Sequence, residues 1–201
     1  MSTAPHTTTT PMRAAAGLAE SEPFACPADL FTRNDGASVR LWTCVRTRPR
    51  WEKKFARWLR AEHMPYFLPT YLRKVLSHRK RRTTVLPLFP GYVFVVGDHT
   101  KQRFIRSESV VRLLKPRCLL ESRALDAQLA SIWLALSTGL PLAPTSELEV
   151  GQRVEITEGP LRGATGKYLR TGQNDCLVVV VDMLGCGVRV ELPADCRVNP
   201  E

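Results

Sequence analysis

The sequence predicts an α+β fold made of two modules: an N-terminal α/β sandwich with an antiparallel sheet, and a small closed C-terminal β-barrel. Strand-like and helix-like segments alternate between Leu41 and Gly139, and short strand-like segments separated by glycines fill roughly the last 50 residues. The chain has 201 residues, 44% of them hydrophobic, which is enough for a buried core. We expect residues 1–38 to be a disordered tail, 39–139 the N-terminal domain, 140–147 a linker and 148–201 the C-terminal domain.

The N-terminal elements follow from periodicity. Residues 41–46 have strand composition, and Pro49 suits the first turn of a helix over 50–63. In that helix Trp51, Phe55, Trp58 and Leu59 share one face. The segments 66–76 and 83–86 then predict a hairpin whose tip carries the basic run 78–82, which must project into solvent or onto an anion because burial of these charges is costly.

The second half contains a helix and then the barrel strands. A helical face made of Leu125, Leu129, Ile132, Trp133 and Leu136 ends at Gly139. Pro141 and Pro144 mark the linker. Strands are expected over 150–156, 166–169, 176–181 and 188–192, and their number and spacing favour a barrel of the SH3 type.

The net charge of +10 is concentrated in the N-terminal domain. Residues 41–118 hold 19 Lys/Arg against 4 Asp/Glu, whereas residues 147–201 hold 6 against 9. Condensed positive charge is typical of a surface that binds a polyanion, although a merely solubilising face is an equally good interpretation of charge alone.

The sequence gives little support for an enzyme or for a secreted protein. The six cysteines form no C-x-x-C pair, and neither a phosphate-binding loop nor a serine-nucleophile motif is present. No window resembles a membrane span, and residues 1–40 lack the apolar core of a signal peptide. We therefore expect a cytoplasmic protein that is not an enzyme and that needs neither a metal nor a cofactor.

Two motifs indicate an interaction protein. The first is Pro87-Leu88-Phe89-Pro90-Gly91-Tyr92-Val93-Phe94, an aromatic and proline turn leading into a strand. The second is Gly151-Gln152-Arg153-Val154-Glu155-Ile156-Thr157-Glu158-Gly159-Pro160-Leu161-Arg162-Gly163.

From about Leu41 to Val198 the chain resembles transcription elongation factors of the NusG type. Trp42, Val45, the run 52–54, the basic hairpin, the Phe89-Pro90-Gly91-Tyr92 turn and Arg106-Ser107 follow the order of that family's N-terminal domain, and the second motif is similar to the KOW motif of its C-terminal barrel. The sequences of Pro87–Pro90 and of the turn at 156–159 are more similar to specialised paralogues of the RfaH kind than to the housekeeping members of the family. Some relatives refold this barrel into helices, but Val178–Val181 favours strand here.

The resemblance implies a transcription elongation and antitermination factor, dedicated to certain operons, that binds the clamp of RNA polymerase and non-template or upstream DNA. A KOW-type ribosome- or RNA-binding protein is the alternative, which the net negative C-terminal module disfavours. A ribosomal protein or the terminator Rho is a possible partner of the KOW domain.

The resemblance also assigns candidate residues. Those for polymerase binding are Phe89, Pro90, Tyr92 and Phe94, and a core role is an open alternative for Phe94. Those for nucleic acid are Arg48, Arg50, Lys54, Arg57, Arg79, Lys80, Arg81, Arg82, Arg106 and Ser109. In the KOW domain Gly159 and Gly163 are expected at turns and Leu161 on the partner surface.

Overall fold

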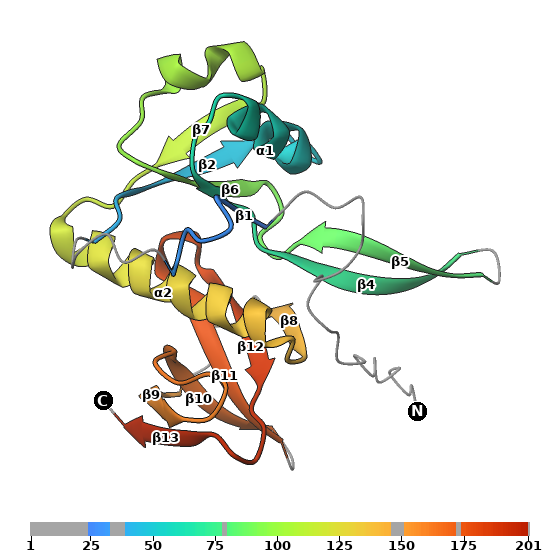
Figure 1. Cartoon of the computed structure of the whole chain (residues 1–201), viewed down its shortest axis with the longest axis vertical. Coiled ribbons are helices and arrows are strands. Elements are labelled where there is room, and N and C mark those ends of the chain that lie inside the picture. The colour runs from blue at the N-terminus through green and yellow to red at the C-terminus, as the bar shows by residue number, and fades with distance from the viewer. Residues whose placement is uncertain (1–23, 33–38, 78–79, 146–150, 172–173, 201) are drawn as a thin grey trace, which may run out of the picture.

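The computed structural model describes residues 24–32, 39–77, 80–145, 151–171 and 174–200. It contains helices and antiparallel sheets, which confirms the predicted mixture of α and β structure. Figure 1 shows a sheet with a short helix in the N-terminal half, a long helix below it, and a second sheet in the C-terminal half.

The N-terminal sheet has five strands in the order β1-β3-β6-β2-β7, and every neighbouring pair is antiparallel. The strands are β1 (Ala25–Cys26), β2 (Trp42–Thr47), β3 (Tyr66–Phe67), β6 (Tyr92–Val96) and β7 (Val110–Leu114). Side chains alternate across it: Val93 and Val95 join one buried cluster and Phe94 the other. Both faces of this sheet are therefore covered.

Helix α1 (Glu52–Ala61) covers one face of this sheet. Phe55, Ala56 and Leu59 are buried against it, and Trp58 is partly buried in the same cluster. The predicted apolar stripe is therefore the core face except at Trp51, which precedes the helix and lies outside that cluster. The helix begins later than expected, because Arg50 has a φ of 65°, outside the helical region. After β6, a 3₁₀ helix (Lys101–Ser107) closes this side through the buried ring of Phe104.

The predicted basic hairpin is formed by β4 (Thr70–Ser77) and β5 (Lys80–Pro87). The two strands pair from Thr70 with Pro87 to Ser77 with Lys80 and extend away from the rest of the molecule (Figure 1). Residues 78 and 79, the centre of the predicted basic tip, lie outside the described residues.

Helix α2 (Leu119–Thr138) lies between the two sheets (Figure 1) and ends at Gly139, which has a φ of 68°. Its buried residues Leu129 and Ile132 belong to one continuous cluster that also contains Phe94 of the N-terminal sheet and Val179 of the C-terminal sheet. The predicted helix is thus confirmed, and it joins both halves of the molecule through a shared core.

The C-terminal sheet has six antiparallel strands in the order β13-β9-β10-β11-β12-β8. They are β8 (Leu142–Thr145), β9 (Gln152–Glu158), β10 (Thr165–Thr171), β11 (Asn174–Val181), β12 (Cys186–Glu191) and β13 (Arg197–Pro200), with a 3₁₀ turn at Asp182–Leu184. The expected closed barrel is not formed: β13 and β8 are the edges of an open sheet. Strand β8 occupies the outer edge of β12, where Leu142 pairs with Val190.

Two segments differ from the sequence expectation. Residues 142–145 of the expected linker form β8, since Pro144 is tolerated in an edge strand. Residues 24–32 of the expected tail are packed, with β1 paired to β3 and Leu30 buried. The helices of the described part include none long and apolar enough to cross a membrane.

Candidate functional site

The turn before β6 is fixed to helix α1 by a buried carboxylate. Gly91 has a φ of 84°, and its backbone N–H donates to Oε1 of Glu52 at 2.6 Å. The carbonyl of Gly91 accepts from the N–H of Thr47 at 2.8 Å, and the N–H of Tyr92 donates to the carbonyl of Phe89 at 3.0 Å. Helix α1, the end of β2 and one bond within the turn therefore hold its conformation.

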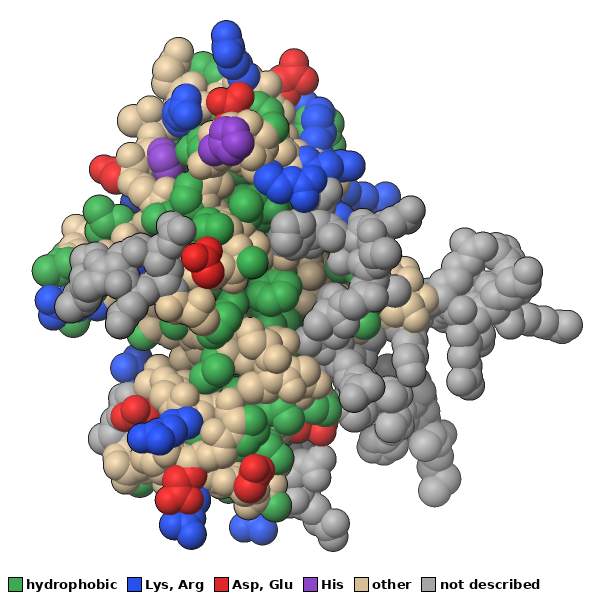
Figure 2. Space-filling view, in the orientation of Figure 1, with side chains coloured by type: hydrophobic (Ala, Val, Ile, Leu, Met, Phe, Trp, Pro, Cys, Tyr) green, Lys and Arg blue, Asp and Glu red, His purple; other side chains and the backbone are tan. Residues whose placement is uncertain are grey.

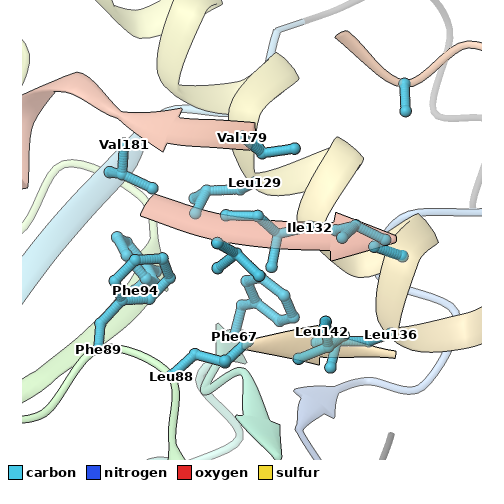
Figure 3. Close-up of a cluster of buried hydrophobic side chains, with 14 of the residues drawn as sticks. Phe67, Leu88, Phe89, Phe94, Leu129, Ile132, Leu136, Leu142, Val179 and Val181 are labelled. Carbon is cyan, nitrogen blue, oxygen red and sulfur yellow. The ribbon is translucent and has the colours of Figure 1, made fainter. Parts of the chain in front are cut away.

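The two phenylalanines of the turn motif are buried. Phe89 is 2% exposed and Phe94 is fully buried, and their rings meet edge to face with centroids 5.7 Å apart. Figure 3 shows both rings in the shared core, in which Leu129 of α2 and Val181 of β11 also lie. The expected apolar dock is thus not an exposed surface in this structure, because α2 and the C-terminal sheet contribute to the core around it. Pro90 is exposed and Tyr92 is half-buried.

A groove of about 800 Å³ opens beside this turn, between α1 and the base of the hairpin. Its wall on the α1 side is tied to the hairpin, because the Nζ of Lys53 donates to the carbonyl of Val85 at 2.9 Å. The ammonium group of Lys53 is therefore used in a structural contact. Residues that line the groove include Arg46, Pro49, Tyr71, Leu86, Pro90 and Tyr92.

Trp51 sits at the start of α1 with two cations on its ring. The Nζ of Lys54 lies 3.7 Å from the ring centroid, and the guanidinium of Arg48 lies 5.2 Å from it. Arg48, Arg50 and Lys54 are exposed, so their charges face solvent. The structure therefore brings two of the predicted nucleic-acid residues, Arg48 and Lys54, together on one indole, and Arg50 precedes that indole in the chain.

The other predicted nucleic-acid residues are placed differently. Arg57 of α1 and Arg106 of the 3₁₀ helix are exposed. Ser109 is buried, and its hydroxyl donates to the carbonyl of Ser107 at 2.8 Å, so it lies away from any surface. Lys80, Arg81 and Arg82 lie in β5 at the outer end of the hairpin, and Arg79 lies outside the described residues.

Positive charge gathers on the N-terminal half. Figure 2 shows Lys and Arg side chains over the region in which Figure 1 draws α1, whereas Lys, Arg, Asp and Glu are mixed on the C-terminal sheet. Lys115 also forms an ion pair with Asp98, and this contact lowers the pKa of Asp98. The charged surface therefore coincides with the half that carries the groove.

The C-terminal glycine motif forms a tight turn with its leucine turned inward. Gly159 and Gly163 have φ values of 93° and 87°, which agrees with the expected turns. The N–H of Gly163 donates to the carbonyl of Ile156 at 2.8 Å, and that of Ala164 to the carbonyl of Leu161 at 2.9 Å. Leu161 is fully buried, so it does not lie on the expected partner surface in this structure.

Glu52 lines the groove and fixes its turn, although it is not among the site residues predicted from the sequence. It is 6% exposed and is among the few acids of a strongly basic segment. An acidic residue in the first turn of a helix is usually explained by its favourable interaction with the helix dipole. The sequence therefore contains no sign that Glu52 has a hydrogen-bond partner in a distant turn. Among the described residues, no group of three or more His, Cys, Asp or Glu side chains is placed to hold a metal ion.

Comparison with known proteins finds a family model that is similar to part of the N-terminal half. No curated protein matches the chain. Residues 40–122 match the family model described as "NusG: Transcription termination factor nusG", a range that contains α1, the hairpin, the groove and the Trp51 surface. Residues 40–122, called the NusG domain below, are therefore similar to the NusG family of transcription factors.

Proposed function

We propose that this chain is a non-enzymatic, cytoplasmic transcription elongation factor that binds RNA polymerase and promotes processive elongation or antitermination at particular operons. The observation that carries the proposal is the groove of the NusG domain, which is lined by the exposed Pro90, the half-buried Tyr92 and residues at the start of the basic helix α1. Such a surface can bind a protein and an adjacent polyanion at the same time.

Polymerase binding is assigned to the groove. Pro90 and Tyr92 line it and are accessible, so they are the residues that contact the clamp. Phe89 and Phe94 support them from the core, where their edge-to-face contact fixes the strand that follows the turn. A half-buried aromatic at the edge of an apolar groove is a typical hot spot of a protein interface.

DNA binding is assigned to the cations beside Trp51. Arg48, Arg50 and Lys54 would neutralise phosphates of the exposed non-template strand. The indole would provide a face for an unpaired base, although in the free protein Lys54 lies on that ring. Arg57 and Arg106 extend the surface, and Lys80–Arg82 of the hairpin would contact upstream DNA.

We interpret the C-terminal sheet as a KOW-type module whose role is to recruit a further partner protein. Candidates are a ribosomal protein and Rho. Because Leu161 is buried, the recruiting surface would use other residues of this sheet or require its rearrangement. The net charge of residues 147–201, 6 Lys/Arg against 9 Asp/Glu, disfavours direct RNA binding.

Polymerase binding is tested with the full chain and core RNA polymerase. Tyr92→Ala should weaken binding about 30-fold, the loss typical of one aromatic hot spot, and should abolish pause suppression. Tyr168→Ala, on the C-terminal sheet, is the matched control and should bind as wild type does. Equal binding by Tyr92→Ala and wild type would remove the groove from the proposal.

DNA binding is tested by charge reversal. A chain carrying Arg50→Glu, Lys54→Glu and Arg57→Glu should lose affinity for a transcribing complex but not for DNA-free polymerase. The control reverses the exposed Arg162 and Arg170 of the C-terminal half, which should change neither affinity. Equal losses in the two assays would exclude DNA from the explanation, and binding to ribosomes without polymerase would favour the alternative function.

A further inference from the structure

A short N-terminal segment, Phe24–Thr32, lies before the NusG domain in sequence and is packed against it in space. Its strand β1 pairs with β3, Ala25 with Phe67 and Cys26 with Tyr66. The carbonyl of Phe24 also accepts from the N–H of Leu68 at 2.7 Å. The segment therefore covers an edge of the five-stranded sheet, which would otherwise present unpaired backbone groups.

Phe31 of this segment is inserted between the NusG domain and α2. Its ring stacks on Trp42 of β2, with centroids 5.7 Å apart and planes 19° apart. It also stacks on Trp133 of α2, at 5.6 Å and 23°, and meets the edge of Phe67 at 5.0 Å. One ring thus touches both the sheet and the helix that lies between the two halves of the chain.

A polar cluster centred on Asp126 of α2 secures the same junction. The carboxylate accepts from the Nη1 of Arg40 at 3.0 Å and from the indole Nε1 of Trp42 at 2.8 Å. The guanidinium of Arg40 also donates to the carbonyls of Leu30 and Phe31, at 3.2 and 3.5 Å, and lies over the Phe31 ring. Arg40 therefore connects the N-terminal segment directly to α2.

The charges in this cluster are partly desolvated. The side chains of Arg40 and Asp126 are 25% and 16% exposed, so their attraction is screened less than that of a surface pair. Each group has more than one partner, and the loss of any partner leaves a polar atom without its bond in a poorly hydrated place. The contacts of the segment and those of α2 are therefore coupled.

We propose that residues 24–32 are a latch that holds α2, and with it the C-terminal sheet, on the NusG domain, with Phe31 as the plug. Release of the latch uncovers Trp42, Phe67 and Trp133 together with the edge of β3, and it frees α2 to separate from the N-terminal sheet. The inference rests on the packing of the junction and is independent of the proposed function.

Hydrogen exchange of the full chain tests the latch. Phe31→Ala removes two stacking contacts, so amides of α2 and β8 should exchange about tenfold faster, while amides of β2 and β6 keep their wild-type rates. Phe24→Ala is the matched control: its ring touches Phe67 but makes no ring contact with α2, so only β1 and β3 should loosen.

A uniform rise of exchange throughout the chain would overturn the latch, because it would show that Phe31 contributes only to global stability. Unchanged exchange in α2 would overturn it as well. Asp126→Asn is a second, milder variant that keeps the shape of the side chain and removes its charge. It should raise exchange in α2 and β8 with the same pattern as Phe31→Ala, and a pattern confined to residues 24–32 would contradict the coupling.

Discussion

The carboxylate of Glu52 accepts a hydrogen bond from the backbone N–H of Gly91 at 2.6 Å, across 39 residues of sequence. This bond connects the first turn of α1, which carries Lys54 beside Trp51, to the turn that lines the groove. This buried contact therefore helps to hold the surfaces assigned to polymerase and to DNA in a fixed relation, together with the bond from Lys53 to Val85.

Loss of the Glu52 carboxylate should destabilise the NusG domain. Glu52→Ala leaves the N–H of Gly91 without its partner in a poorly solvated place, which should lower the free energy of unfolding by about 1–3 kcal/mol in urea titrations. Glu52→Gln keeps a neutral acceptor and should cost less. Glu62→Ala, at an exposed position just after α1, is the control and should change little. A Glu52→Ala chain as stable as wild type would show that water replaces the carboxylate.

Truncation of Phe89 should act on folding as well as on binding. Because the side chain is 2% exposed and packs against Phe94, Phe89→Ala should cost about 3–5 kcal/mol in thermal or urea unfolding. Tyr92→Ala, at the half-buried neighbour, should cost about 1 kcal/mol. Similar small losses for both would show that Phe89 is not held in the core in solution.

Several features of the fold could be predicted because they are local. The apolar spacing from Leu125 to Leu136 predicts α2, and Gly139 predicts its C-terminal end. The β-branched run Val178–Val181 lies in β11, and the turn at Phe89–Tyr92 precedes β6. In each case the signal lies within one turn or one strand.

The remaining features depend on contacts between distant segments. Phe89 between two prolines is typical of an exposed turn, and only the placement of α2 and the C-terminal sheet buries it. Strand β1 has two residues and no pattern, and β8 contains Pro144, so each forms only because a neighbouring strand has a free edge. Leu161 is likewise buried by contacts with residues outside its own turn, as a member of the shared core. The groove likewise exists only where α1 meets the hairpin base.

Two glycine substitutions should separate backbone strain from steric clash. At Gly91 the φ is 84° but a Cβ would meet nothing within 4 Å, so Gly91→Ala should cost about 1–2 kcal/mol, from strain alone. At Gly187 a Cβ would lie 2.5 Å from the backbone oxygen of Val179, so Gly187→Ala must displace β11 from β12 and should cost about 3 kcal/mol. Urea titrations check both values, and a smaller loss at Gly187 than at Gly91 would contradict the register of β11 and β12.

Thiol alkylation should distinguish the buried from the exposed cysteines. Burial raises the pKa of the Cys44 thiol far above its ordinary value, so the native chain holds almost no Cys44 thiolate at neutral or mildly alkaline pH. Cys118 is exposed. Iodoacetamide at about pH 8 should therefore modify Cys118 at least about 100-fold faster than Cys44, as measured by mass spectrometry of the tryptic peptides.

The same raised pKa makes the folded chain hold the Cys44 proton more tightly than the unfolded chain. The contribution of Cys44 to stability is therefore fully present below the ordinary thiol pKa of 9.0 and declines as the pH rises above it.

The alkylation experiment is controlled in concentrated urea, where the unfolded chain should expose both thiols and iodoacetamide should modify Cys44 and Cys118 at similar rates. This control also shows that both tryptic peptides are recovered. Rapid modification of Cys44 in the native chain would show that the core between the N-terminal sheet and α2 opens readily.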